Sequence, residues 1–183
     1  KKTMTFKIDT FVSHLKQGGA LGSLFECSVT GAKGSGAGDT ESEFKFMCKE
    51  AVLPASTIEA GTVTYMGRAL QIPGNRAAQQ LNTTVYNDED MAIRNNIENW
   101  MDMINSHLSN SRQTGMSKIN SYTGTLEVKQ LSKEDVGSVK TYTFKDCWPS
   151  SCAEVPLSWE TNEIQTFAVT WEYNYWLSTE AGI

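Results

Sequence analysis

Apolar and polar residues alternate along several stretches of the chain, which is the pattern of strands that bury one face. The alternation is clearest near the C-terminus, where Phe167, Val169, Trp171, Tyr173 and Tyr175 are separated by polar or small residues. Such a strand needs a core on one side and water on the other, so the sequence predicts mostly antiparallel β-structure. The other predicted strands lie at 24–29, 43–50, 81–86, 122–129 and 141–145.

Two of these strands have predicted ends. In the stretch 43–50, Phe44, Phe46 and Cys48 are expected to face the core. Leu53-Pro54 is expected to end that region, because proline cannot donate a hydrogen bond to a β-ladder. The Cys-Trp-Pro segment at 147–149 is expected to close the strand at 141–145.

The spacing of apolar residues also predicts one main helix at 88–105 and a short helix at 9–17. Asn87 is the expected N-cap of the main helix, and the acidic run 88–90 is expected in its first turn, where the positive end of the helix dipole stabilises it. Gly18-Gly19 is expected to end the short helix. The apolar stripe of the main helix consists of Ile93, Ile97, Trp100, Met101, Ile104 and Leu108.

The remaining segments have little core pattern. The Gly-rich segment 31–39 is predicted to be a flexible hairpin tip, since it lacks the Gly-Lys-Ser/Thr sequence of a phosphate loop. The segment 55–80 has short β-rich pieces broken by glycine and proline, which favours an extended hairpin or arm. A C-terminal tail is predicted at 177–183. The length of 183 residues predicts a single domain over 1–183.

The chain is acidic, with 16 Lys and Arg against 21 Asp and Glu and a net charge of −5. Tight phosphate binding needs basic side chains, so this charge argues against a tight nucleic-acid binder. Most aromatic residues fall on the apolar side of predicted strands, which favours core packing over base stacking. No apolar run approaches the roughly 18 residues of a membrane span, and no signal peptide is recognised. No membrane anchor is therefore expected, and the cysteines are expected to be reduced.

Candidate catalytic and metal-binding groups are scarce. Cys147 and Cys152 have a C-x4-C spacing, but the two histidines, His14 and His107, both lie in predicted helical stretches. Consecutive helical residues point about 100° apart, so the acidic run 88–90 would not converge on one ion. The sequence predicts no catalytic, cofactor-binding or metal-binding residues and no cofactor. An enzyme with an unrecognised site stays an alternative, because a catalytic triad need not be local in sequence.

Three stretches resemble the tail tube protein of contractile-tailed bacteriophages. They are 48–55 (Cys-Lys-Glu-Ala-Val-Leu-Pro-Ala), 86–100 (starting Tyr-Asn-Asp-Glu) and 147–176 (starting Cys-Trp-Pro). The third is the most specific, since it contains Leu157-Ser158-Trp159 and then an alternating strand. The three stretches follow the family's order.

The resemblance implies a mainly β fold: an antiparallel β-barrel or sandwich with one main flanking helix and a long extended arm. It implies a structural virion protein, not an enzyme, that is assembled in the host cytoplasm as hexameric rings stacking into a tail tube. The implied partners are other copies, the tail sheath, the baseplate and the tape-measure protein. Double-stranded DNA would pass without tight binding, because a polar or acidic lumen repels a polyanion. The alternative is a tube protein of a contractile secretion or bacteriocin system.

The arm gains a role from this resemblance. Its apolar residues are predicted to reach a neighbouring subunit, in the same ring or the next, and Trp176 beyond the last strand is a further candidate. The alternative is a hairpin folded on its own domain. The predicted inter-subunit residues are Ile58, Val63, Tyr65, Met66, Leu70, Ile72 and Trp176.

Overall fold

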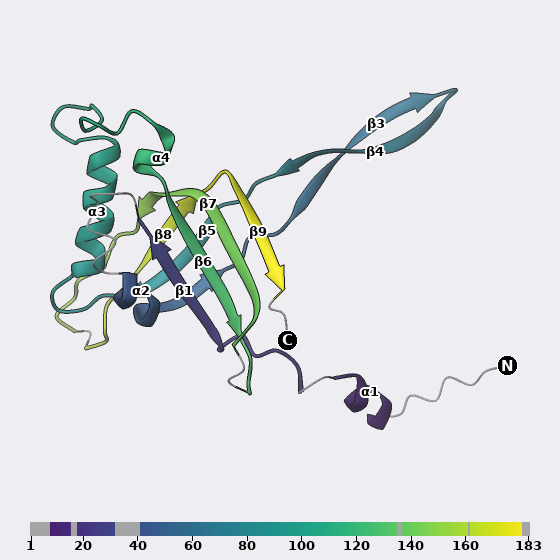
Figure 1. Cartoon of the computed structure of the whole chain (residues 1–183), viewed down its shortest axis with the longest axis horizontal. Coiled ribbons are helices and arrows are strands. Elements are labelled where there is room, and N and C mark those ends of the chain that lie inside the picture. The colour runs from purple at the N-terminus through teal and green to yellow at the C-terminus, as the bar shows by residue number, and fades with distance from the viewer. Residues whose placement is uncertain (1–7, 16–17, 32–40, 135–136, 161, 181–183) are drawn as a thin grey trace.

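A seven-stranded antiparallel sheet curves around the core, and a long two-stranded hairpin projects from it (Figure 1). The computed structural model describes residues 8–15, 18–31, 41–134, 137–160 and 162–180. The strand order is β1-β6-β7-β8-β5-β2, with β9 paired to β7, while β3 and β4 form the separate hairpin. This mainly β architecture, with one main helix and an extended arm, confirms the predicted fold class.

The elements follow one another along the chain with these bounds: α1 Ile8–His14, β1 Phe25–Thr30, α2 Glu41–Met47, β2 Cys48–Val52, β3 Thr57–Tyr65, β4 Arg68–Ala77, β5 Leu81–Tyr86, α3 Ala92–Ile104, α4 Ile119–Tyr122, β6 Gly124–Leu131, β7 Ser138–Cys152, β8 Thr166–Glu172 and β9 Tyr175–Glu180. None of the described helices has the length and apolar character needed to cross a membrane.

β7 joins the two halves of the sheet, because it is long enough to pair with different strands along its length. Its N-terminal part pairs with β6 and β9, and its C-terminal part pairs with β8. The prediction that 147–149 closes this strand is wrong. Pro149 is buried opposite Trp171, next to a register shift between Pro149 and Ser151. A bulge is one of the places where a sheet tolerates proline.

The single C-terminal strand predicted at 166–175 is two strands. β8 contains the buried residues Phe167, Val169 and Trp171, and the chain turns at Asn174 before β9 begins. Trp176 therefore does not lie beyond the last strand. It belongs to β9, stands opposite Phe144 and packs against Tyr142 with the rings tilted and their centroids 5.8 Å apart. Part of the predicted tail, 177–180, continues β9, and 181–183 lies outside the described residues.

The main helix closes the core. Ile93, Ile97 and Trp100 are buried, and Met101 and Ile104 pack at the margin, as the apolar stripe predicted. The ring of Trp100 lies 5.9 Å from that of Trp171, and its indole N–H donates to the carbonyl oxygen of Tyr122 at 2.7 Å.

The predicted C-terminal member of that stripe, Leu108, is fully exposed, because α3 ends at Ile104. The predicted cap is also wrong. Met91 is the N-cap residue, in a left-handed conformation with φ 52°, and the acidic run 88–90 precedes the helix. The Asp88 carboxylate still accepts a hydrogen bond from the amide of Ala92 at 3.2 Å. One acidic group therefore remains near the positive helix end, as the dipole argument requires.

The strand predicted at 43–50 is a helix over its first part, α2, and a strand from Cys48 onward. Phe44 is buried while Phe46 is 79% exposed, so the two do not share a face. Phe44, Met47 and Cys48 instead follow the helical spacing of three and four residues. They bring α2 against β1 and the core, beside the two outer strands β1 and β2 of the sheet.

The short N-terminal helix predicted at 9–17 is found at Ile8–His14, with 16–17 outside the described residues. Gly18 and Gly19 follow it with positive φ. Most of the predicted flexible segment 31–39 also lies outside the described residues. The predicted strand at 122–129 begins two residues later than expected, because Tyr122 ends the short helix α4.

Substitution of Gly124 tests the packing between the sheet and α3. A Cβ atom at this position would collide with the carbonyl oxygen of Thr30 and lie 2.8 Å from Cη2 of Trp100. We expect Gly124→Ala to lower the free energy of unfolding by roughly 1–3 kcal/mol, the usual cost of overpacking. Urea denaturation measures this. Gly22→Ala is the control, since a Cβ there meets nothing within 4 Å; equal losses in both variants would contradict the packing argument.

Candidate assembly surfaces

The arm formed by β3 and β4 is exposed along nearly its whole length. It leaves the sheet between β2 and β5 and extends away from the core (Figure 1). β3 has nine residues, and at about 3.3 Å per residue it spans about 30 Å. An isolated two-stranded hairpin is at best marginally stable in water. The arm therefore presents a long surface that has little support from its own chain.

The register of the arm gathers its apolar side chains on one face. Val63 is opposite Leu70 and Gly61 is opposite Ile72, while Tyr65 is opposite Arg68. Directly opposed residues of antiparallel strands share a face. We call Val63, Tyr65, Arg68, Leu70 and Ile72 the arm face; its four apolar members are between 48% and 64% exposed.

The other face of the arm carries fewer large apolar side chains. Thr62 donates a hydrogen bond to the side chain of Gln71 at 3.0 Å, and Thr64 is opposite Ala69. By alternation along β3, Ile58 lies on this second face. Met66 is at the tip, where Met66 and Gly67 both have positive φ, as a two-residue type I′ turn requires. The structure thus brings together four of the six arm residues predicted as inter-subunit contacts.

A second exposed apolar surface is formed by residues 153–160 and 162–165, the described part of the connection between β7 and β8, which we call the β7–β8 loop. Leu157 and Ile164 are largely exposed and Trp159 is fully exposed. With Val155 and Glu163 they line a surface hollow of about 310 Å³. Contiguous exposed apolar side chains of this kind typically mark an interaction site. The sequence pattern assigns no contact role to this segment. The one feature that could have indicated a surface is its three large apolar residues, Leu157, Trp159 and Ile164, which follow neither strand nor helix periodicity.

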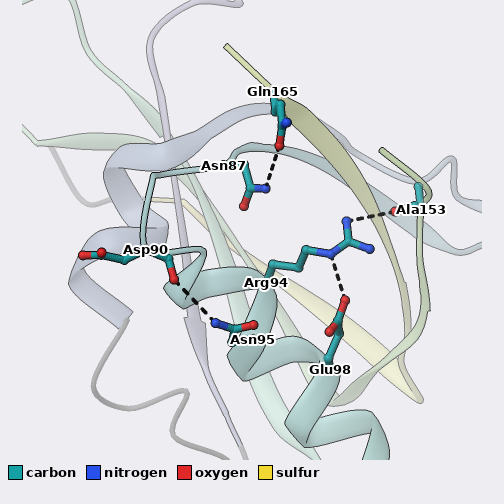
Figure 2. A network of polar contacts seen from close by, with 7 residues as sticks. All are labelled: Asn87, Asp90, Arg94, Asn95, Glu98, Ala153 and Gln165. Carbon is teal, nitrogen blue, oxygen red and sulfur yellow. Dashed lines mark hydrogen bonds and ion pairs between the residues drawn. The ribbon is translucent and has the colours of Figure 1, made fainter. Parts of the chain in front are cut away.

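Both ends of the β7–β8 loop are fixed to the residues at the start of α3 (Figure 2). The guanidinium of Arg94 donates to the carbonyl oxygen of Ala153 at 3.2 Å and to the carboxylate of Glu98 at 2.8 Å. The backbone amide of Asn87 donates to the carbonyl oxygen of Gln165 at 2.9 Å, and their side chains are also hydrogen-bonded. Hydrogen bonds therefore anchor both ends of the loop next to α3.

α1 presents a third apolar surface. Figure 1 shows it apart from the seven-stranded sheet, on the N-terminal segment. Ile8, Phe11, Val12 and Leu15 are exposed, and their spacing of three and four residues places them on one side of the helix. The helix therefore has an apolar face that is not packed against the core of its own subunit.

The cysteines lie in two different environments. Cys27 and Cys147 are buried, and burial raises the pKa of the Cys147 thiol to about 12. A hydrogen bond with Cys48 is the main reason that the pKa of Cys27 is raised. Cys152 lies near Arg94 and Glu98 instead, so the C-x4-C spacing does not bring Cys147 and Cys152 to one site. Within the described residues, no three His, Cys, Asp or Glu side chains converge as metal ligands.

Another hollow, of about 440 Å³, lies where α3 ends beside β7. Its apolar lining is Met101, Ile104, Trp148 and Pro149, and His107 also lines it. The described groups with shifted pKa values, four cysteines and Tyr173, are not among its lining residues. In the described part of the chain, the clearest candidate sites are therefore the exposed apolar surfaces and not a cluster of reactive side chains.

Exposed apolar surfaces on a curved antiparallel sheet are typical of a structural subunit that assembles with other chains. Comparison with known proteins gives the family. The chain matches the phage tail tube protein family over residues 13–179, and it belongs to this family. It is 32% identical over 134 residues to tail tube protein gp19 of Enterobacteria phage T4, covering 73% of this chain and 80% of the relative. The same values hold for tail tube protein gp19 of Enterobacteria phage T6.

Solved structures share the fold at much lower identity. The tube-terminating cap of the anti-feeding prophage has a TM-score of 0.64 at 12% identity, covering 88% of this chain and 91% of that one. The sheath-tube complex of an extracellular contractile injection system has a TM-score of 0.60 at 11% identity, covering 97% and 100%. The resemblance to tail tube proteins is therefore confirmed, and the chain is a structural component of a phage virion.

Arg94 is expected to position the β7–β8 loop. Removing its side chain in Arg94→Ala deletes the hydrogen bond to Ala153, and a hydrogen bond to a charged group contributes about 1.5–3 kcal/mol. We expect faster hydrogen exchange of the loop amides, measured by mass spectrometry on the unassembled protein. Glu98→Ala is the control, because it leaves the Ala153 contact in place; equal acceleration in both variants would show that Arg94 does not hold the loop.

Proposed function

We propose that this chain forms the inner tail tube of a contractile-tailed phage by stacking hexameric rings, through which double-stranded DNA passes. The supporting observation is the arm face, an apolar surface that the chain's own core leaves exposed. The sheath would surround the tube, the baseplate would hold its end, and a tape-measure protein would set its length. Trp176 remains a proposed contact residue as well, although it also packs inside the subunit.

The sheet edges also suit a ring. In the described part of the chain, β9 pairs only with β7, β1 only with β6, and β2 only with β5. Unpaired edges invite further pairing, and a closed ring gives each edge a partner without forming an open-ended aggregate. The same pairing of strand edges would occur in every ring of the stack.

The charge of the chain suits a channel for DNA. Its net charge is −5, and some of its basic side chains are paired with acids. Lys129 pairs with Glu127 at 3.5 Å, and Lys45 pairs with Glu26 at 3.0 Å. Paired and acidic groups do not neutralise phosphates, so the DNA would not bind tightly to the wall.

A tube of a contractile secretion or bacteriocin system is the second candidate. Its support is the fold shared with an extracellular contractile injection system. The phage role is favoured because the family match covers residues 13–179 and the sequence relatives at 32% identity are phage tail tube proteins.

The role of the arm is tested by making its apolar face polar. Val63→Thr with Leu70→Thr keeps strand-compatible side chains but removes apolar area, and a fully buried Val or Leu contributes roughly 1.5–3 kcal/mol. We expect a folded, soluble protein that forms no tubes in negative-stain electron micrographs. The matched control is Thr64→Ser with Ala69→Ser, the neighbouring opposed pair on the other face. Normal tubes from the first variant would exclude the arm face from assembly.

Passage without retention is tested with assembled tubes and linear DNA. We expect wild-type tubes not to co-sediment DNA at low salt, because an acidic wall repels phosphates. Glu127→Lys and Glu172→Lys, tested separately, place a basic side chain on each half of the sheet. The variant whose altered residue lines the bore should retain DNA in a salt-dependent way. Salt-sensitive retention by the wild-type tube would contradict a non-binding lumen.

A further inference from the structure

The arm face and the β7–β8 loop are two exposed apolar surfaces on different parts of one chain. The arm projects from one side of the barrel, and the loop lies beside α3 on the opposite side (Figure 1). A contact between these surfaces within one subunit is therefore not formed. Two distinct surfaces on opposite sides allow a head-to-tail contact, in which the arm of one copy meets the loop of the next.

The charges of the two surfaces are complementary. The arm carries Arg68 and Arg76 against a single acid, Glu59. The β7–β8 loop carries Glu154, Glu160 and Glu163 and no basic residue in its sequence. Opposite net charges favour contact between two surfaces, so an acidic surface on a second copy suits the arm.

The positions of two of these charges are specific. Arg68 is opposite Tyr65 on the arm face, beside its apolar side chains. Glu163 lines the hollow that also contains Leu157 and Trp159. Neither charge forms a salt bridge among the described residues. Each surface therefore combines apolar side chains with one charge of opposite sign, which gives a contact both affinity and register.

The β7–β8 loop is preorganised for binding because both of its ends are anchored by hydrogen bonds. Arg94 holds it at Ala153 and Asn87 holds it at Gln165 (Figure 2). A surface fixed in this way loses less conformational entropy on binding than a free segment does. The arm's span of about 30 Å is comparable with the diameter of a small domain, so its tip can reach a neighbouring subunit.

We propose that the arm face of one copy docks on the β7–β8 loop of a second copy, with Tyr65 and Leu70 against Leu157 and Trp159, and Arg68 paired with Glu163. The proposal rests on the proposed function and names the surface that the arm contacts. The contact is heterologous, so every copy gives one arm and receives one, and repetition produces a closed ring or a continuing stack.

Charge reversal tests the pairing. Arg68→Glu and Glu163→Arg each place like charges at the contact. Each is expected to raise the protein concentration needed for assembly by roughly tenfold or more, equivalent to about 1.4 kcal/mol per contact. The double variant, which restores opposite charges, is expected to assemble at close to the wild-type concentration. Sedimentation velocity measures assembly, and electron microscopy identifies its form.

Mixing the two single variants tests whether the contact joins different copies. In an equimolar mixture, the acidic arm of the Arg68→Glu variant meets the basic loop of the Glu163→Arg variant. The alternate contact joins the unaltered arm of the second variant to the unaltered loop of the first, so it keeps the wild-type pair. We expect the mixture to assemble at a concentration at which neither variant assembles alone.

Two further reversals are the matched controls for the charge change itself. Arg76→Glu alters the opposite face of the arm, and Glu154→Arg alters a loop residue outside the lining of the hollow. Both variants should assemble like wild type, because neither changes a charge at the proposed contact. A tenfold loss in both controls would mean that net charge rather than this pairing governs assembly.

The outcomes separate this docking from the proposed function. If the Arg68→Glu or the Glu163→Arg variant forms rings or tubes as readily as the wild type does, the docking is overturned but the tube function stands. The same applies if both reversals block assembly and neither the double variant nor the mixture restores it. A wild-type chain that stays monomeric at high concentration would overturn both proposals.

Discussion

The packing of Trp100 of α3 against Trp171 of β8 closes the core, and this closure determines what the rest of the chain can do. The inner face of the sheet is filled by buried aliphatic and aromatic side chains, and α3 is part of that core. No inner face is left for the arm, whose apolar side chains stay in water in the isolated subunit. Since burial of such surface is the main stabilising contribution in association, the completed core leaves apolar arm side chains that the proposed contact with another chain would bury.

The helix that closes the core also organises the surface. The residues of α3 that face inward are Ile93, Ile97 and Trp100, while Arg94, on its side, lies over the ring of buried Phe167 and reaches the β7–β8 loop. One element therefore connects the interior to an exposed apolar surface. A change in the core that shifts α3 would move the loop as well, so the proposed docking surface depends on the packing of this helix.

Periodicity predicts those parts of the fold where the pattern fits only one kind of element. The strand predicted at 81–86 has the bounds of β5, since Leu81, Thr83 and Val85 alternate strictly inward. The prediction for 43–50 fails because its apolar residues fit a helix and a strand equally well, and contact with β1 decides for a helix. The prediction that Pro149 closes its strand fails because a β-bulge accommodates the proline within the sheet.

For the surfaces, the sequence locates the arm but not its faces, because the register between β3 and β4 determines which side chains lie together. The β7–β8 loop is missed as a surface, since a segment without periodicity gives no sign of whether its apolar residues are buried. Only the structure shows Leu157 and Trp159 exposed and the loop ends anchored.

A tube must be stable as a whole while its subunits stay soluble until assembly begins. The proposed arm contact of a few apolar side chains would be too small by itself to hold two free copies together against the lost translational and rotational freedom, which costs several kcal/mol. Once a copy is held by a ring, however, each further contact is made at high effective concentration and adds its stabilisation with little new cost. An arm that contributes modestly by itself therefore suits a polymer that forms on a template, and a net charge of −5 helps to keep free copies apart.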